Sequence, residues 1–298
     1  MSARHNRYLQ LDVFARIAGG GNPVGVVIGA DGWSDAAMQR FAAWTELVET
    51  TFVLEPGSTE ADYRLRLFTP SREIAFAAHP SLGSARAVLE SGFRQARDGV
   101  LVQQCDVGLI TIRLHEDDGD EALFLRAPDA TVRESGFDAH PLLAEALGDR
   151  APGRLAPALM DGGRRWWVAE LADERMLRDW HPDHDAIRRL AEATDSMGLC
   201  AFARCDGPDF ELAVRALAGG AGITEDPASG AANGLVAAWL REAEPDGPFA
   251  RGYRVSQGRE IGRDARLVLR IEDDGVWVGG RAFTVIDGHV SWPDAARG

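Results

Sequence analysis

The sequence predicts an α+β protein with two similar domains, each a curled, barrel-like and mostly antiparallel sheet around one central buried helix. Two observations carry this prediction. The chain repeats itself at an offset close to half its length, and each half has one apolar helix among strands with two-residue alternation. The 298 residues also exceed the usual size of one small domain, so two domains are expected.

The repeat is clearest where a proline step precedes a run of small residues. Segments 78–85 (AHPSLGSA) and 225–232 (EDPASGAA) share the pattern [His/Asp]-Pro-x-x-Gly-small-Ala, with His79 and Asp226 separated by 147 residues (226 − 79). Segments 62–67 and 209–214 match at the same offset (209 − 62). Two further matches follow the same order, at offsets of 149 (187 − 38) and 156 (268 − 112). Four ordered matches indicate a duplicated domain.

Each half is expected to contain strands, a helix, more strands, a buried helix and final strands. Ser34 should cap a helix that starts at Asp35 and buries Met38, Phe41 and Ala42. The buried helices should start at the His-Pro and Asp-Pro steps, because proline suits a first helical turn. Expected strands are 8–14, 25–29, 50–54, 63–68, 109–115 and 266–271. Residues 127–163 are interpreted as the crossing between halves. The predicted domains are 1–127, completed by a C-terminal strand 284–298, and 128–283.

Composition excludes several classes of function. The net charge of −14 argues against nucleic acid and against an anionic membrane surface, since both attract basic proteins. The polar start of the chain and the lack of a long apolar run favour a cytoplasmic protein without a membrane span. Three scattered cysteines predict no disulfide framework, and neither Cys200-x4-Cys205 nor His181-Pro-Asp-His184 predicts a metal site.

The chemistry is expected between the halves, where two helix N-termini would present free N–H groups and positive dipole ends. Such a cradle suits a small anionic substrate, such as a carboxylate. Its predicted contacts are Ser81 and Gly83 in the first half and Ser229, Gly230 and Ala231 in the second. The glycines would let the ligand approach the backbone. The alternative is that the two proline steps are only good helix starts.

Glu49 is the predicted acid/base. Its counterpart at offset 149 is Gly198 (198 − 49), so the fold does not require a carboxylate there. Apolar neighbours such as Val48 and Phe52 should disfavour its charged form and move its pKa toward the operating pH, which suits proton transfer. The alternative is a surface glutamate at a strand edge.

Other features predict less. The segment 19–23 (GGGNP) does not fit a dinucleotide-binding or phosphate-binding loop and is interpreted as a tight turn. Trp166 and Trp167 are interpreted as strand core or interface. No His–Asp pair accompanies Ser81, Ser84 or Ser229, so a nucleophilic serine is not expected.

Taken together, the motifs resemble the PhzF family of phenazine biosynthesis-like isomerases, over nearly the whole chain. They are Asn22-Pro23, Glu49-Thr-Thr-Phe52, Phe68-Thr-Pro70, Phe76-Ala-Ala-His-Pro-Ser-Leu-Gly83, Glu225-Asp-Pro-Ala-Ser-Gly230 and Gln257-Gly258 through Gly262-Arg263. The resemblance implies the diaminopimelate epimerase-like fold and a cofactor-independent isomerase that forms homodimers. It implies that Glu49 moves a proton between two carbons while His79 and Asp226 hold the substrate, and it places Asn22 among the substrate contacts.

The sequence departs from the family pattern at Ala78, where glycine is usual, and at Ala231, where serine is usual. Leu217 and Gly219 also blur a stretch that usually reads Arg-x-Phe-x-Pro. Related epimerases use two cysteines near the positions of His79 and Asp226, and their absence here disfavours two-cysteine racemisation. Two alternatives stay open: a non-catalytic ligand-binding or interaction protein on the same scaffold, and an epimerase with one carboxylate base.

Overall fold

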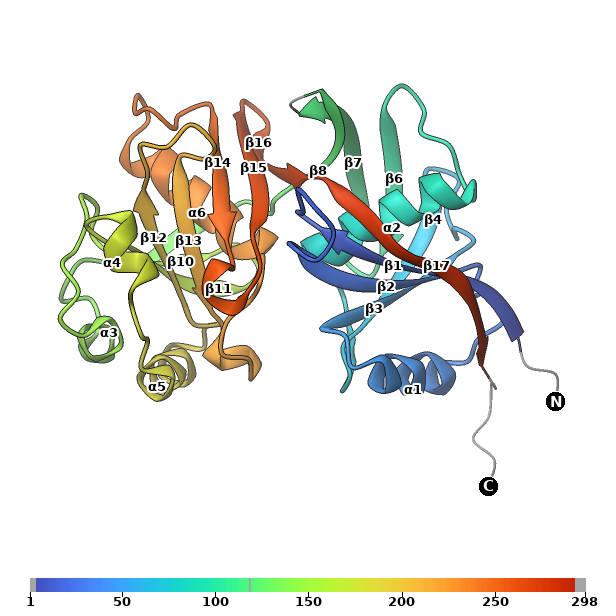
Figure 1. The fold of residues 1–298 in the computed structure, drawn as a ribbon, viewed down its shortest axis with the longest axis horizontal. Helices are drawn as coiled ribbons and strands as arrows, with labels where there is room; N and C mark the ends of the chain where they lie inside the picture. Colours follow the sequence, from blue (N-terminus) through green and yellow to red (C-terminus); the bar gives the residue numbers. More distant parts are fainter. Residues whose placement is uncertain (1–3, 118, 293–298) are drawn as a thin grey trace. The chain divides into compact units, whose positions relative to one another are not determined.

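The computed structural model describes residues 4–117 and 119–292 and divides the chain into two compact units (Figure 1). The first unit is Met1–Arg126 together with Gly279–Gly298, and the second is Ala127–Val278. The sequence placed these divisions at 127/128 and 283/284. In the structure, the second division therefore lies five residues earlier than predicted (284 − 279). Strand β16, Gly275–Gly280, runs across that division.

The first unit follows the predicted order of strands, helix, strands, buried helix and strands. Its elements are β1 Arg4–Val13, β2 Asn22–Ile28, α1 Asp35–Thr45, β3 Glu49–Leu54, β4 Tyr63–Phe68, β5 Glu73–Ile74, α2 Ala78–Ser91, β6 Val100–Cys105, β7 Gly108–Asp117, β8 Asp120–Arg126 and β17 Ala282–Trp292. Ser34 caps α1 as predicted, since its side chain accepts the N–H of Ala37. Met38, Phe41 and Ala42 are buried on the face that packs with β3.

The second unit repeats this order with two additional short helices, α3 and α4. Its elements are β9 Thr131–Ser135, α3 Pro141–Leu147, β10 Ala158–Asp161, β11 Arg165–Glu170, α4 Glu174–Arg178, α5 His184–Thr194, β12 Leu199–Arg204, β13 Leu212–Leu217, the 3₁₀ turn Gly219–Ala221, α6 Gly230–Ala243, β14 Gly252–Gln257, the 3₁₀ turn Arg259–Ile261 and β15 Ala265–Glu272. The interpretation of 127–163 as a crossing is wrong, because this segment supplies two strands and a helix. Trp166 and Trp167 are buried in β11, as predicted for strand core.

Strand pairing shows that the two units are copies of one plan. In the first, β2–β3 and β4–β6 are parallel, while β1–β17, β1–β2, β3–β4, β4–β5, β6–β7 and β7–β8 are antiparallel. In the second, β11–β12 and β13–β14 are parallel among antiparallel neighbours. One long helix is buried in each unit: α2 along most of its length, and α6 from Ala232 to Ala237. This is the predicted fold class.

The register of the repeat agrees with the sequence match at an offset of 149 and differs from the two matches at 147. Thr50 lies opposite Phe68 and Leu199 lies opposite Leu217, so β3 and β4 match β12 and β13 at an offset of 149 (199 − 50, 217 − 68). Helices α2 and α6 start at an offset of 152 (230 − 78). The offset of 147 from the proline steps is therefore wrong: His79 lies inside the first turn of α2, whereas Asp226 lies four residues before α6. Ser229, and not Asp226, caps that helix.

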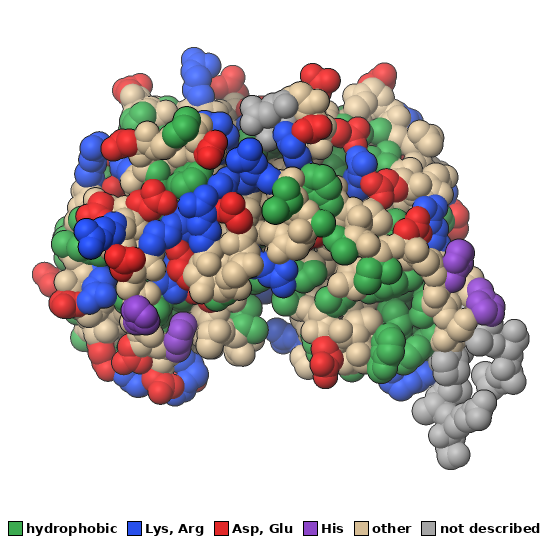
Figure 2. Space-filling view, viewed as in Figure 1, with side chains coloured by type: hydrophobic (Ala, Val, Ile, Leu, Met, Phe, Trp, Pro, Cys, Tyr) green, Lys and Arg blue, Asp and Glu red, His purple; other side chains and the backbone are tan. Residues whose placement is uncertain are grey.

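The surface in Figure 2 carries basic side chains beside acidic ones. Several form ion pairs along or between helices, such as Arg188–Glu192 and Arg189–Glu145. Within the described ranges, no helix has the length and apolarity needed to span a membrane.

Candidate active site

Glu49 opens β3 and lies opposite Val24 of the parallel strand β2. On the same face of β3, the Thr51 hydroxyl lies 2.8 Å from the Ser84 hydroxyl of α2, so this face is turned toward the central helix. Phe52 packs on the opposite face in the apolar cluster around α1. The prediction that Phe52 desolvates Glu49 is therefore wrong, because alternate residues of a strand point to opposite faces.

The central helix brings His79 to Glu49. Helix α2 begins at Ala78, one residue before His79, as the His-Pro step predicted. Nε2 of His79 lies 3.5 Å from Oε2 of Glu49, and the two side chains are only 8% and 12% exposed. Two of the three predicted catalytic residues thus meet within the first unit.

Burial lowers the pKa of His79 to about 3, and a hydrogen bond to the backbone of Pro23 opposes this shift only in part. Proline has no N–H, so that backbone partner is the Pro23 carbonyl, and the ring must donate to it. Nε2 has no hydrogen-bond partner among the described residues, which leaves Nδ1–H as the donor. The neutral imidazole therefore turns an unprotonated Nε2 toward Glu49.

The glycine-rich segment is a tight turn that leads into Asn22. The buried Asp12 carboxylate accepts the N–H groups of Gly19 at 2.6 Å and Gly21 at 3.0 Å. A Cβ at Gly21 would lie 2.2 Å from the Val13 carbonyl oxygen, so only glycine fits there. Asn22 follows at the start of β2, fully buried. Its assignment as a substrate contact stays a prediction.

Ser81 and Gly83 have structural roles instead of the predicted place at a helix N-terminus. The backbone N–H of Ser81 already bonds to the Ala77 carbonyl, and its buried hydroxyl donates to Ala77 and accepts from Gln103. A Cβ at Gly83 would lie 2.5 Å from Cγ1 of Val24, so this glycine lets α2 pack against β2. The predicted anion cradle at 81–83 is wrong, because these residues lie within the helix and not at its free end.

In the second unit, Asp226 lies in a loop fixed on several sides. Its backbone N–H donates to the Ala216 carbonyl in β13, and its carboxylate Oδ1 accepts the N–H of Ala228. The carbonyl of Asp226 accepts from the buried side chain of Gln257. The Asp226 residue itself is half-buried. His79 and Asp226 belong to different units, and their common site stays a prediction.

The start of α6 agrees better with the predicted contacts. Ser229 caps the helix by accepting the N–H of Ala232, Gly230 is buried, and Ala231 is exposed in the first turn. The N–H groups of Gly230 and Ala231 are the first of the helix, where intrahelical partners are lacking.

Two buried amides, for which the sequence predicted no role, connect Asp226 to α6. Gln257 accepts the N–H of Ser229 at 3.3 Å and the side-chain amide of Asn233 at 2.8 Å, while its own amide donates to Asp226 at 2.8 Å. Both amide side chains are fully buried. The signal was present, since Gln257-Gly258 belonged to the motifs of the resemblance, but its partners lie 24 to 31 residues away.

Comparisons with known proteins agree with this architecture. Residues 11–288 match the family described as phenazine biosynthesis-like protein. The chain is 32% identical over 290 residues to antisense-enhancing sequence 1 of Schizosaccharomyces pombe, covering 94% of this chain and 97% of that protein. It is also 32% identical over 283 residues to trans-2,3-dihydro-3-hydroxyanthranilate isomerase of Pseudomonas aeruginosa, covering 91% and 92%. The chain therefore belongs to the phenazine biosynthesis-like family, and the predicted class, a PhzF-like isomerase, is confirmed.

Solved structures show the same fold. A PhzF family protein of Bacillus anthracis superposes with a TM-score of 0.84 at 23% identity, covering 96% of this chain and 99% of that one. A hydroxyproline epimerase of Agrobacterium vitis superposes with a TM-score of 0.61 at 16% identity, covering 98% and 94%. The epimerase-like fold predicted from the sequence is thus confirmed.

Proposed function

We propose that this isomerase moves a proton between two carbons of a small cyclic carboxylate, with Glu49 as the group that carries the proton. The observation that supports this most is the contact between Glu49 and His79 within one unit, 3.5 Å apart and nearly buried. A nearly buried carboxylate beside a neutral imidazole is suited to accept a proton and return it.

His79 supplies a hydrogen-bond acceptor for the proton that Glu49 carries between the two steps. Its Nδ1–H is committed to the Pro23 carbonyl, so Nε2 is a hydrogen-bond acceptor. Two acceptor atoms that face each other repel, whereas a proton on Glu49 Oε2 would point at a lone pair. Protonated Glu49 is therefore stabilised by neutral His79, and ionised Glu49 is proposed to accept the proton of a substrate C–H.

The reaction then needs no redox partner. Glu49 removes a proton from a carbon made acidic by neighbouring unsaturation or a carboxylate, and the C–H electron pair delocalises into the substrate. The same proton, or one exchanged with water, returns to a different carbon. Asp226, with its backbone fixed by Ala216 and Gln257, is proposed to hold a polar group of the substrate.

The substrate proposed for a first test is trans-2,3-dihydro-3-hydroxyanthranilate, the compound in the name of the Pseudomonas aeruginosa relative. The protein should convert it in deuterium oxide and place deuterium on carbon in the product. A panel of other small carboxylic acids should be run beside it. If no compound is converted and none gains deuterium at carbon, the non-catalytic ligand-binding alternative gains support.

We propose further, from the family resemblance, that the enzyme is a cytoplasmic homodimer that needs no cofactor. Its net charge of −14 favours solubility and argues against nucleic acid or an anionic membrane surface as a partner. Sedimentation at several concentrations tests the dimer. Turnover that survives exhaustive dialysis against a chelator tests the independence from a dissociable metal.

A further inference from the structure

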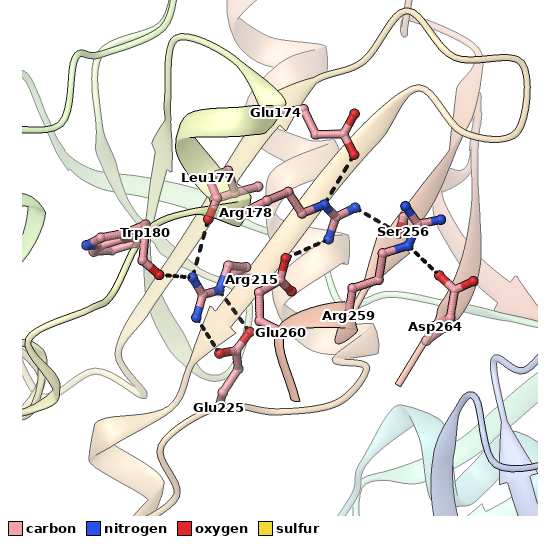
Figure 3. Close-up of polar contacts among 12 residues, drawn as sticks. Glu174, Leu177, Arg178, Trp180, Arg215, Glu225, Ser256, Arg259, Glu260 and Asp264 are labelled. Atoms are coloured by element: carbon pink, nitrogen blue, oxygen red, sulfur yellow. Dashed lines mark hydrogen bonds and ion pairs between the residues drawn. The ribbon is translucent and has the colours of Figure 1, made fainter. Parts of the chain in front are cut away.

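The second unit contains an ion pair that is more deeply buried than its counterpart in the first unit. Arg215 of β13 binds Glu225 through two parallel contacts, Nε to Oε1 at 3.1 Å and Nη2 to Oε2 at 2.8 Å (Figure 3). The side chains are 5% and 3% exposed. Nη1 of Arg215 also donates to the carbonyls of Leu177 and Trp180, at 3.3 and 2.6 Å. The pair thus ties the loop before α6 to the end of α4.

Glu225 immediately precedes Asp226, and Arg215 immediately precedes Ala216, which accepts the N–H of Asp226. The ion pair and this backbone hydrogen bond therefore join neighbouring residues of β13 to neighbouring residues of the same loop. Arg215 lies on the face of β13 shared with Ala213 and Leu217 in the apolar cluster with α5, so Asp226 belongs to the other face. Displacing Glu225 would move the backbone that carries Asp226.

The first unit has the same kind of contact without an adjacent site residue. Arg66, third from the end of β4 as Arg215 is in β13, binds Glu73 through two contacts of 2.7 Å. These side chains are 14% and 32% exposed. Glu73 is followed by the buried Ile74, and His79 comes only five residues after that. The scaffold thus uses this pair twice, but only the second copy lies next to a predicted catalytic residue.

We propose that the Arg215–Glu225 pair positions the Asp226 carboxylate for the substrate, an inference that rests on the proposed role of Asp226. A buried ion pair adds little stability over apolar side chains of similar volume, because desolvation offsets the attraction. Its contribution is geometric: two parallel bonds and two backbone carbonyls fix the loop in one position. Arg215 and Glu225 are positioning residues, since neither side chain lies on the face to which Asp226 belongs.

The test compares Arg215→Met/Glu225→Leu with the matched variant Arg66→Met/Glu73→Leu. The first readout is amide hydrogen exchange of the intact protein, which needs no activity. Exchange at Asp226 and Ala228 should rise at least about 10-fold in the first variant, as local opening becomes easier, and stay unchanged in the second.

The second readout is kcat/KM with trans-2,3-dihydro-3-hydroxyanthranilate, in the parent and in an Asp226→Ala background. The Arg215/Glu225 variant should lose roughly 10- to 100-fold in the parent, the scale expected when a contact is misplaced by about 1 Å. It should lose no more than about 2-fold further in the Asp226→Ala background, because residues that act through one another are not additive.

Unchanged exchange at Asp226 and Ala228 would overturn the proposal, and so would full additivity with Asp226→Ala. If Asp226→Ala itself left turnover intact, the proposed role of Asp226 would fail, while the exchange data would still judge the positioning claim. Should the double variant not fold, Arg215→Lys keeps the charge but loses the paired geometry. It should raise exchange at the same two amides, and normal protection there would contradict the proposal.

Discussion

Strands β3 and β12 occupy the same place in the two units, yet β3 begins with Glu49 and β12 is preceded by Gly198. The backbone of Gly198 has a φ of +142°, and a Cβ there would lie 2.0 Å from the Leu217 carbonyl oxygen. A carboxylate is therefore sterically excluded from the second unit at the position where the first carries one. The contrast teaches that the duplicated scaffold provides the framework, while the chemistry depends on where one copy departs from the other.

The ion pairs teach the complementary lesson. Arg66–Glu73 and Arg215–Glu225 are the same device in two copies, so their presence alone marks no function. What differs is the next residue, which is Ile74 in one unit and Asp226 in the other. Predictions that separate scaffold from site should therefore change one copy and use the other as its control.

The largest expected effect is on stability, at Gly198. Gly198→Ala should lower the free energy of unfolding by about 3 kcal/mol or more, because the side chain meets backbone and the positive φ disfavours any L residue. Urea denaturation measures this. Gly207→Ala is the control, since a Cβ at Gly207 meets no atom within 4 Å. A loss below about 1 kcal/mol in Gly198→Ala would show that the exclusion is not real.

A smaller effect concerns the buried imidazole of the first unit. The pKa of His79 is lowered from 6.5 to about 3, so as the pH falls the unfolded chain takes up this proton first. The stability gained from a neutral His79 is complete above about pH 6.5 and is lost toward pH 3, at up to about 1.4 kcal/mol per pH unit. Between pH 7 and pH 5 the loss should be about 2 kcal/mol.

His79→Gln should remove that component and flatten the acid dependence of the unfolding free energy. The exposed His181 of the second unit offers the control, because His181→Gln should keep the full dependence. Equal acid sensitivity in His79→Gln and the parent protein would mean that the imidazole is not held neutral by burial.

The smallest effect distinguishes the two central helices. Gly83→Ala should cost about 1–2 kcal/mol, since the new Cβ would lie 2.5 Å from Val24 and overpacking outweighs the gain in helix propensity. Gly234 of α6 is less crowded, because a Cβ there would lie 3.1 Å from its nearest neighbour, Cβ of Ala127. The free energy of unfolding of Gly234→Ala should therefore lie within about 0.5 kcal/mol of the parent value. Thermal unfolding of both variants measures the difference, and equal losses would remove this contrast between the helices.

The sequence predicted the elements that depend on local chemistry. Three such signals are Ser34 before an apolar helix, the alternation of β4 and the proline at the start of α2. Each acts within a few residues, so the sequence alone was enough to predict the element. Even the duplication was visible. The offset between the two buried helices was not visible, because the loop before α6 is three residues longer than the loop before α2, and matching the two proline steps hid that difference.

The site was predicted less completely, for a similar reason. Glu49 and His79 could be selected by residue type and motif, but their contact depends on which face of β3 turns toward α2. Phe52 was assigned to the same face of β3 as Glu49 because it is close in sequence, but it lies on the opposite face. The roles of Gln257, Asn233 and Arg215 require partners that only the folded sheet brings within hydrogen-bond distance.

The central claim is that Glu49 carries the proton, and one measurement tests it most directly. Deuterium incorporation at carbon from trans-2,3-dihydro-3-hydroxyanthranilate should be followed by mass spectrometry for the parent and Glu49→Gln, with the exposed Glu46→Gln as control. Glu49→Gln keeps the shape of the side chain but cannot accept the proton, so its turnover and exchange should fall by about 10²–10⁴-fold, with folding unchanged. Glu46→Gln should match the parent. Turnover of Glu49→Gln at the parent rate would contradict the account, because another group would then be moving the proton.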